Sequence, residues 1–437
     1  MNGNDTNRIP SRWAPPFFTI WIGQAFSLLG SQLVQFALIW WLTQTTGSAR
    51  VLATASLVGL LPQVVLGPII GALVDRWNRR VIMVLADSTI ALATLGLAFL
   101  FWTGQEQIWQ VYLLMFVRAT AGGFHWPAMQ ASTSLMVPKE HLARVQGLNQ
   151  MLQGGMNIVS APLGALLLGW FPIQGVLFID IGTAVLAIVP LLFIRVPQPK
   201  PDLSSQPAGA GSSVWQEFLT GLRYALSWPG LVIIGAMAAL INFLVTPAFA
   251  MLPLLVTGHF GGQAIQLAGL ESTMGIGVIL GGITLSIWGG FRRRIVTSMA
   301  GLFVIAVGSL LVGLAPANAY YLAVAAMFVI GFSLPMINGP VLAIIQGVVD
   351  PEMQGRIFTL INSAATAMAP LSLIIAGPLA DKFGVQMWFV VLGIATALMG
   401  VSAFFIPAVM NLEQGRSQQD MPARGKASLS TSPVDGD

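Results

Sequence analysis

The sequence predicts an all-α membrane protein with twelve transmembrane helices in two pseudo-symmetric halves of six helices each. Three observations lead to this prediction: an apolar composition, twelve apolar segments of membrane-spanning length, and a partial internal repeat. Of the 437 residues, 55% are hydrophobic and 8% are charged, whereas soluble proteins have about 25% charged residues. So few charged side chains cannot cover a water-exposed surface of this size, which excludes an ordinary soluble fold.

Twelve apolar segments are long enough to cross the hydrocarbon core of a bilayer, which takes about 20 helical residues. The chain is also rich in glycine and proline, with 47 and 26 residues, as is typical of membrane helices that pack closely and bend. The predicted spans are 16–42, 51–73, 81–103, 109–134, 145–170, 175–195, 229–257, 265–290, 296–316, 320–349, 357–379 and 386–410.

The basic residues give an orientation for these spans. With the N-terminus in the cytoplasm, seventeen of the twenty Lys and Arg residues fall in cytoplasmic segments, and only Arg50 and Lys382 fall in outer loops. This asymmetry is the positive-inside pattern, and one missed helix would destroy it because every later loop would be inverted. Both termini are therefore predicted to be cytoplasmic.

A polar segment divides the chain. Residues 196–228 begin with a stretch rich in Pro, Gly and Ser and end with apolar residues near helical spacing, from Trp215 to Leu226. This pattern indicates a cytoplasmic linker with an amphipathic helix at the membrane surface. We expect one six-helix half at 1–195, a second at 229–410, and a disordered cytoplasmic tail at 411–437.

The two predicted halves share part of their sequence. VPKEHLARVQGLNQ starts at Val137 and VDPEMQGRIFTLIN starts at Val349, with Pro, Glu, Arg and Asn at nearly matched offsets. Further on, Ala-Pro-Leu precedes glycine with the same spacing at 161–169 and at 369–377. Parallel halves with a site between them at mid-depth are typical of one large class of secondary transporters.

The sharpest local motif lies between spans two and three, where the chain reads GALVDRWNRR from Gly71 to Arg80. It resembles the signature loop of the major facilitator superfamily in residue types, spacing and position along the chain. It departs from the family pattern at Asn78, where the family has glycine. Asparagine tolerates positive φ better than other non-glycine residues, so we expect the tight turn to survive.

The resemblance implies the major facilitator fold and alternating access. It also implies a cytoplasmic gate that stabilises the outward-open state and releases when the protein opens inward. The alternative interpretation is that the basic residues only fix the topology. The gate residues would be Gly71, Asp75, Arg76, Arg79 and Arg80.

On overall pattern, including FHWPAMQASTSLMVPKEHLARVQGLNQ from Phe124, the chain is similar to the bacterial drug:proton antiporter branch that contains macrolide efflux proteins and the enterobactin exporter. The family's exporter motif in span five is matched only by small residues and Pro162 in another register. The resemblance implies a monomer in the bacterial cell membrane that exports an amphipathic small molecule in exchange for protons. No cofactor or metal is implied.

Four charged residues lie inside predicted spans, where a charge is a functional candidate by default. Arg118 and Gly122 resemble a span-four motif of the superfamily that is thought to take part in proton coupling. Asp180 and Glu271 share the outer half of the membrane with Arg118, whereas we expect Asp87 to pair with the inner arginine cluster. Desolvation raises the pKa of a carboxyl group and a nearby arginine lowers it, so each acid is a candidate proton carrier. The alternative is a buried ion pair that fixes helix packing.

Uncharged polar residues in the spans are candidates for a substrate cavity, with interhelical hydrogen bonds as the alternative. In the superfamily, spans one, four, seven and ten line the central path. We expect His125 to pack at a helix kink beside Pro127. The cavity candidates are Gln24, Gln35, Asn242 and Asn338.

The sequence also weighs against other functions. It has no cysteine and three histidines, no Gly-x-x-x-x-Gly-Lys-Ser/Thr segment for ATP, and basic residues placed for a membrane rather than for nucleic acid. Uptake of a small solute by the same fold is the main alternative to export. A membrane-embedded enzyme would need clustered catalytic groups, and a scaffold would not need intramembrane charges.

Overall fold

The computed structural model describes residues 13–198 and 222–414, without the side chains of Pro68, Ala72, Asp75, Pro351 and Glu352. Within these ranges the chain is almost entirely helical and contains no strand. Most of the predicted amphipathic segment and most of the predicted tail lie outside the described residues. Residues 222–226 are helical, and Leu412–Gln414, which were expected to be disordered, form a short 3-10 helix with Leu412 buried.

Six long helices precede the linker and six follow it. The first six are α1 (Ala14–Thr46), α2 (Ala49–Arg76), α3 (Arg79–Thr103), α4 (Ile108–Met136), α5 (Lys139–Trp170) and α6 (Ile173–Phe193). The second six are α8 (Pro229–Ala250), α10 (Ala264–Trp288), α11 (Arg294–Leu314), α12 (Tyr320–Val348), α13 (Pro351–Phe383) and α14 (Gln386–Phe404). The short elements are α9 (Leu252–Leu254), the π-helical η1 (Leu255–His259), α15 (Pro407–Met410) and η2 (Leu412–Gln414).

Each predicted span corresponds to one of these long helices. By length and composition, eleven of the described helices can cross a membrane, and α4 is the long helix outside that set. Its hydropathy is lowered by Arg118, His125 and Gln130, which lie among apolar residues. Because α4 packs against α2 and α3 inside the bundle, its polar side chains need not face lipid.

Asn78 does not adopt the left-handed turn that we expected. Its φ is −65°, and its side chain caps α3 by accepting the backbone N–H groups of Arg80 and Val81. An N-cap residue has extended backbone and supplies a side-chain oxygen, which asparagine does well and glycine cannot do. The departure from the family pattern therefore has a capping function in this chain.

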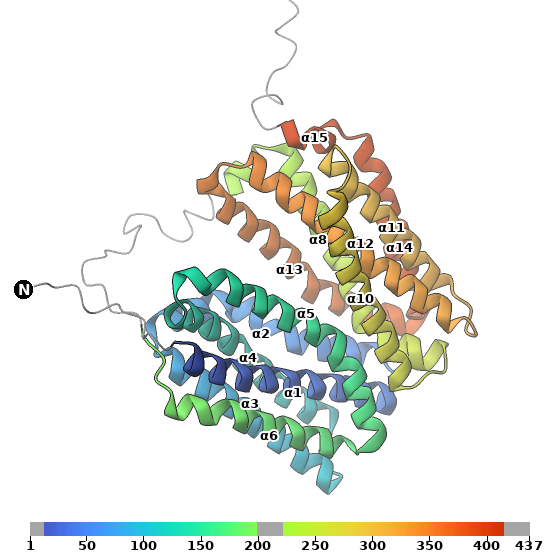
Figure 1. Ribbon diagram of the computed structural model, residues 1–437. Helices are drawn as coiled ribbons and strands as arrows, with labels where there is room; N and C mark the ends of the chain where they lie inside the picture. Colours follow the sequence, from blue (N-terminus) through green and yellow to red (C-terminus); the bar gives the residue numbers. More distant parts are fainter. Residues whose placement is uncertain (1–12, 199–221, 415–437) are drawn as a thin grey trace, which may run out of the picture.

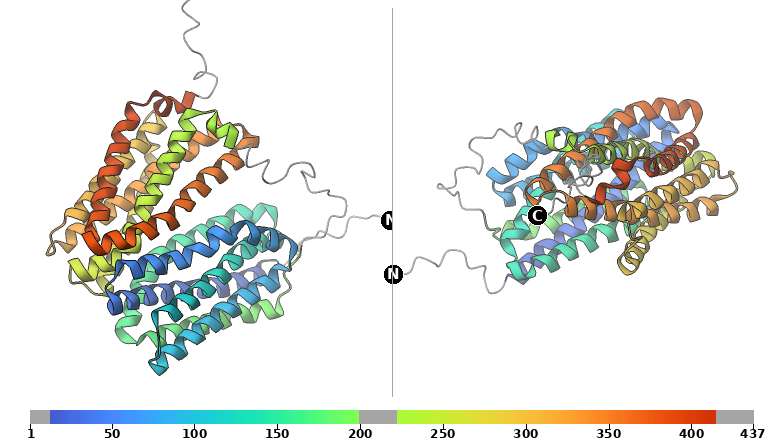
Figure 2. Two further views of the ribbon diagram at one scale, coloured as in Figure 1. Left: turned by 180° about the vertical axis from the view of Figure 1, so that it is seen from behind. Right: turned by 90° about the horizontal axis from the view of Figure 1, so that it is seen from above.

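The long helices form two bundles that lean against each other (Figure 1). In the first bundle α1 packs on α5 and α6, and α4 packs on α2 and α3; in the second, α12 packs on α10 and α11, and α8 on α13. We call the end of the molecule that holds Phe193 and Pro229 the linker end, and the opposite end the far end. The bundles diverge at the linker end and meet at the far end, as Figure 1 and the left view of Figure 2 show.

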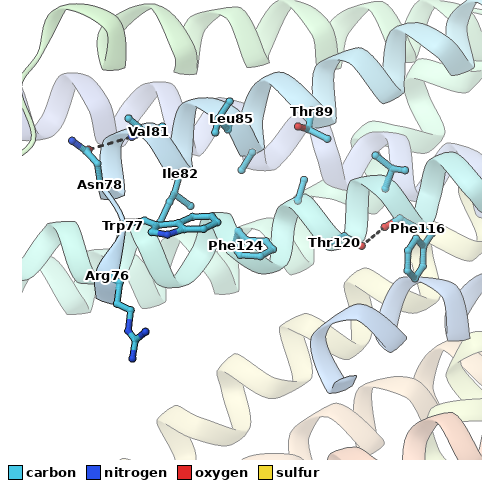
Figure 3. A pocket seen from close by; sticks show the side chains of 13 residues that line it. Arg76, Trp77, Asn78, Val81, Ile82, Leu85, Thr89, Phe116, Thr120 and Phe124 are labelled. Atoms are coloured by element: carbon cyan, nitrogen blue, oxygen red, sulfur yellow. Dashed lines mark hydrogen bonds between the residues drawn. The ribbon is translucent and has the colours of Figure 1, made fainter. Parts of the chain in front are cut away.

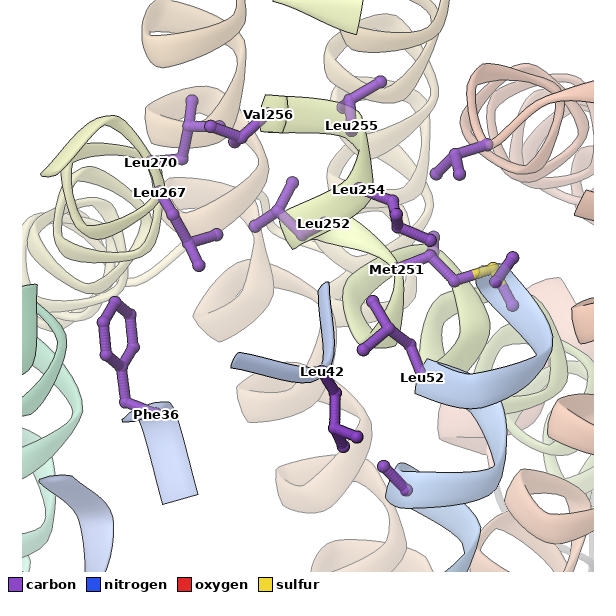
Figure 4. Packing of buried hydrophobic residues seen from close by; sticks show 14 of the residues in the cluster. Phe36, Leu42, Leu52, Met251, Leu252, Leu254, Leu255, Val256, Leu267 and Leu270 are labelled. Carbon is purple, nitrogen blue, oxygen red and sulfur yellow. The ribbon is translucent and has the colours of Figure 1, made fainter. Parts of the chain in front are cut away.

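Direct contacts close the far end. Asp381, near the end of α13, accepts the backbone N–H of Ala49 at 2.6 Å, at the start of α2. Ser272 of α10 donates to the carbonyl of Ile158 in α5 at 3.1 Å. One hydrophobic cluster there draws on both bundles, including Leu42 and Leu255 (Figure 4). Burial of this shared apolar surface away from water seals the far end.

At the linker end each bundle has a hydrophobic core of its own. One cluster around Phe17 and Ile82 belongs wholly to the first bundle, and another around Trp228 and Ile295 belongs wholly to the second. No cluster that the structure describes joins the bundles there. In the described part of the chain, the gap between the bundles is therefore open at the linker end and closed at the far end.

Candidate functional site

A cavity of about 690 Å³ lies between the two bundles. Its walls come from α1, α2, α3 and α4 of the first bundle and from α8 of the second, where Thr246, Phe249 and Ala250 face it. Apolar surface exceeds polar surface in the lining, and the charged groups are concentrated on α3 and α4. The polar lining residues are Ser27, Ser31, Gln32, Gln35, Ser56, Gln63, Asp87, Arg118, His125 and Thr246.

Arg118 and Asp180 form a buried ion pair beside this cavity. Nη1 of Arg118 lies 2.7 Å from Oδ2 of Asp180, and the two residues are 9% and 0% exposed. Thr94 donates to the same carboxylate oxygen at 2.8 Å and also contacts Arg118. Ser31 donates to Oδ1 at 3.3 Å. These contacts join α1, α3, α4 and α6, and they give the Asp180 carboxylate hydrogen-bond donors on both oxygens, as a buried charge requires.

Asp87 lies in a second buried cluster. Gln24 donates from Nε2 to Oδ2 of Asp87 at 2.9 Å, and Nε2 of His125 lies 3.4 Å from Oδ1. The same His125 nitrogen lies 2.6 Å from Oε1 of Gln24. All three residues are at most 3% exposed. His125 is buried near Pro127 as expected, but its ring belongs to a polar cluster, which the sequence did not indicate.

The expected pairing of Asp87 with the inner arginines was wrong. Arg79 donates to the carbonyl of Ala131 in α4 at 2.7 Å, and Arg80 donates to the carbonyls of Leu191 and Leu192 at the end of α6. A cation near a helix C-terminus interacts favourably with carbonyl groups that have no partner within the helix. These two arginines therefore find acceptors within their own bundle, two helical turns away from Asp87.

The other residues of the predicted gate lie at the linker end of α2. Arg76 is exposed, and a Cβ atom built on Gly71 would meet nothing within 4 Å. The side chain of Asp75 lies outside the described residues. In this structure the bundles are apart where these residues lie.

Glu271 is separate from the cavity. It lies on α10 next to Ser272, where α10 packs on α5, and it is half-buried. It makes no hydrogen bond or ion pair with any residue that the structure describes, and it does not line the cavity. The structure therefore groups Arg118, Asp180 and Asp87 around one space and leaves Glu271 apart.

The four expected cavity residues divide in the structure. Gln35 lines the cavity, whereas Gln24 is fully buried in the cluster with Asp87. Asn242 is exposed and donates to the carbonyl of Ala238, one turn earlier in its own helix. It lies four residues before Thr246, on the same face of α8, and therefore in the open part of the gap. Asn338 is exposed and outside the lining.

His125 is the cavity residue that sequence reasoning missed. It follows Arg118 by seven residues, or two helical turns, so the two share one face of α4. This seven-residue spacing could have identified His125 as a cavity residue from the sequence. The hydroxyl groups of Ser31 and Thr94 had no comparable signal, because serine and threonine in membrane helices commonly bond to their own backbone.

A second space, of about 710 Å³, lies between α3 and α4 (Figure 3). It is lined almost entirely by apolar atoms, including Leu85, Phe116 and Phe124, with Arg76 at its linker end. These α4 residues occupy the face opposite to the one that carries Arg118. This groove therefore opens on the outside of the first bundle and is not part of the central cavity.

In the described residues, twelve long helices form two bundles, with a cavity between them that carries charged side chains and is open at one end; this arrangement defines a secondary membrane transporter. Residues 20–373 match the sequence model of the Major Facilitator Superfamily, and the chain belongs to this family.

Relatives and solved structures agree with this assignment. The chain is 32% identical over 403 residues to macrolide efflux protein A of Streptococcus pyogenes, covering 92% of this chain and 98% of the relative. It is 25% identical over 398 residues to multidrug efflux pump Tap of Mycolicibacterium fortuitum, covering 88% and 94%. A bacterial homologue of the human lysosomal transporter Spinster, solved in an inward-facing and unoccupied conformation, has a TM-score of 0.64 at 14% identity, covering 92% of this chain and 98% of that chain.

Three expectations from the sequence are thereby confirmed. The fold is the major facilitator fold, the relatives include the drug efflux branch, and the chain is a multi-pass transporter of small molecules rather than an enzyme. Among the residues that the structure describes, no group of three His, Asp or Glu side chains is placed to hold a metal ion.

Proposed function

We propose that this protein exports an amphipathic small molecule, such as a macrolide, another drug or a siderophore-like compound, from the bacterial cytoplasm in exchange for protons. The single observation that carries the proposal is the cavity between the bundles, largely apolar but with Arg118 and Asp87 in its wall and Asp180 buried behind Arg118. A largely apolar cavity with a few placed polar groups suits an amphipathic ligand. The names of the macrolide and multidrug efflux relatives point to the same class of substrate.

The orientation of the chain supports the proposed direction of transport. The positive-inside pattern assigns the linker end and both termini to the cytoplasm, and the gap is open at that end. The described conformation is then inward-facing, with the cavity available to a substrate from the cytoplasm or the inner leaflet. Closing the linker end and opening the far end would complete alternating access, with 1–195 and 229–410 moving as the two halves about the 196–228 linker and one chain acting as a monomer.

The gate at the linker end supports the second half of this cycle. Gly71 of the GALVDRWNRR motif has open space around it while the bundles are apart, and α2 packs along α13. Lacking a side chain, Gly71 would let α2 approach α13 closely once the linker end closes. The linker end of α2, which carries the rest of the predicted gate, would then lie close to the start of α13, and Arg76, Arg79 and Arg80 would remain at the headgroup level.

Proton coupling is assigned to the intramembrane charges. Asp180 is held by Arg118, Thr94 and Ser31. Asp87 has no arginine beside it among the described residues, and its neighbour is His125. Glu271 stands alone at the contact of α10 with α5. A carboxyl group that binds a proton in one conformation and releases it in the other couples the proton gradient to the conformational change.

The test measures accumulation of a radiolabelled macrolide in inside-out membrane vesicles from a strain that lacks its own exporters. Vesicles with the wild-type chain should accumulate the macrolide, and a protonophore should abolish the accumulation. Asp87→Asn and Asp180→Asn should lower the accumulation about tenfold or more. Glu271→Gln tests whether the acid outside the cavity contributes to the accumulation. Glu140→Gln, which changes an exposed acid on α5, is the matched control. Accumulation confined to right-side-out vesicles would indicate uptake and contradict the proposal.

A further inference from the structure

Two polar clusters lie at two depths in the first bundle. Each of three helices contributes one polar residue to each cluster, and the two residues on the same helix are seven positions apart. Seven helical residues span roughly 10 Å. The pairs are Gln24 and Ser31 on α1, Asp87 and Thr94 on α3, and His125 and Arg118 on α4.

The cluster nearer the linker end consists of Gln24, Asp87 and His125. We propose that Asp87 and His125 together hold one exchangeable proton, and that Gln24 positions them for it. This inference deepens the proposed function and rests on it, because it identifies the group that carries the coupled proton. It also separates this group from the Arg118–Asp180 pair two turns further from the linker end.

The hydrogen bonds fix where hydrogen atoms lie in this cluster. The Nε2 group of Gln24 donates to Oδ2 of Asp87, so the Gln24 atom that faces His125 is the carbonyl Oε1. An amide oxygen can only accept, and the 2.6 Å contact therefore requires hydrogen on Nε2 of His125. The other acceptor near this nitrogen is Oδ1 of Asp87, at 3.4 Å.

The second ring nitrogen of His125 remains available. Nδ1 makes no hydrogen bond to any residue that the structure describes, and His125 lines the cavity. Protonation of Nδ1 would give an imidazolium ion beside the Asp87 carboxylate without breaking an existing hydrogen bond. The net charge of the pair changes from negative to zero, which a low-dielectric site accommodates better than an isolated charge.

Asp87 and His125 are the groups near the cavity whose net charge can change. Arg118 on α4 and Asp180 on α6 neutralise each other at 2.7 Å. The residues that α1, α2 and α8 contribute to the cavity are uncharged. The net charge of the cavity wall is therefore set by Asp87 and His125.

The pair also lies on the side of the cavity nearer the open end, where a bound proton can leave toward the cytoplasm. The seven-residue offsets place Asp87 and His125 on the linker side of Thr94 and Arg118, and both residues line the cavity. Because Gln24, Asp87 and His125 come from three helices, movement of α1 against α3 and α4 would separate Gln24 from the other two. Such a movement would change how firmly the pair holds its proton.

Histidine side-chain NMR tests the proposal without any substrate. The full chain has three histidines, so labelling all three and comparing with His125→Gln assigns the His125 signal. Glutamine keeps a side-chain N–H for Gln24 but does not titrate. We expect the His125 ring signals to show proton gain at Nδ1 when the pH is lowered in the wild type, and to respond differently in Asp87→Asn, which removes the carboxylate 3.4 Å from Nε2. The exposed-acid control Glu140→Gln should leave the wild-type response unchanged. A His125 response to pH that is the same in wild type and Asp87→Asn would overturn the proposal.

Transport in proteoliposomes gives the second readout, with a radiolabelled macrolide as the probe. The measured quantity is the ratio of pH-gradient-driven transport to counterflow, in which labelled and unlabelled macrolide exchange without net proton movement. His125→Gln should lower this ratio about tenfold or more, and Gln24→Ala should shift its pH dependence. His259→Gln, whose ring bonds to the carbonyl of Ala315 far from the cavity, should change neither. An unchanged ratio in folded His125→Gln would overturn the inference. Absence of macrolide transport by the wild type would instead count against the proposed function, and the NMR result would then decide whether Asp87 and His125 hold the proton.

Discussion

Oδ1 of Asp381 lies 2.6 Å from the backbone nitrogen of Ala49, so the end of α13 in one bundle caps the start of α2 in the other. The same carboxylate accepts the hydroxyl of Ser48 at 3.2 Å and lies 3.6 Å from Nε of Arg50. A carboxylate at a helix N-terminus satisfies free N–H groups and interacts favourably with the helix dipole. This contact holds the far end closed while the linker end is open.

The sequence repeats the elements of this contact at the other end of the same helix pair. Gly377 precedes Asp381 by four residues, as Gly71 precedes Asp75. A Cβ atom on Gly377 would lie 3.0 Å from the Cα of Arg50, so glycine is needed for this close approach. The two ends of the α2–α13 pair therefore carry the same Gly-x-x-x-Asp arrangement.

Removing the far-end cap should open that end. The chain has no cysteine, so Leu42→Cys, at a fully buried position of the far-end cluster, reports access through labelling by a membrane-impermeant maleimide. Asp381→Ala should raise the labelling rate about fivefold, because a helix cap contributes about 1 kcal/mol. Lys382→Gln, its exposed neighbour, is the control. A rate that stays at the background value would show that the cap does not hold the far end.

The buried ion pair should behave as a unit. Asp180→Asn leaves Arg118 without its countercharge and should lower the unfolding free energy by about 3 kcal/mol. The double variant with Arg118→Gln should recover a large part of that loss, which thermal melting in detergent measures. A loss in the double variant equal to the sum of the losses in Asp180→Asn and Arg118→Gln would mean that the charges do not interact. Transport should stay low in the double variant if the pair is functional as well as structural.

The seam between α10 and α12 should tolerate no added side chain. A Cβ atom on Gly281 would lie 2.1 Å from the backbone oxygen of Phe332, whereas one on the next residue, Gly282, would meet only Pro335 at 4.0 Å. Gly281→Ala should therefore lower stability by about 2 kcal/mol or more, while Gly282→Ala should be near neutral. Melting temperatures of the two purified variants provide the comparison. Equal behaviour of the two would contradict the packing described here.

The helices were predictable because apolar length alone defines a membrane span. The boundaries of the helices were less predictable. The span predicted at 229–257 is in fact α8, which ends at Ala250, followed by α9 and η1. Pro253 lacks the N–H that a continuous helix would need there, but hydropathy does not register such a break. Helix α5 begins at Lys139 and not at the predicted 145. Its first turns are polar, so a search for apolar segments leaves them out.

The site was predictable residue by residue but not as a set of contacts. Arg118, Asp87 and Asp180 were identified because lipid penalises any charge. Which acid meets Arg118 depends on how four helices rotate against one another, and one sequence does not specify that rotation. The far-end cap on Asp381 was also missed, although its Gly-x-x-x-Asp spacing is visible, because its partner is a helix N-terminus rather than a side chain.

The central claim is that a proton gradient drives a small molecule through the cavity between the bundles. The most direct test is macrolide transport by the purified protein in proteoliposomes under an imposed pH gradient, with the buffers otherwise matched. We predict accumulation on the acidic side, its collapse when the gradient is dissipated, and its loss in Asp87→Asn. Accumulation that is the same with and without the gradient would contradict the account.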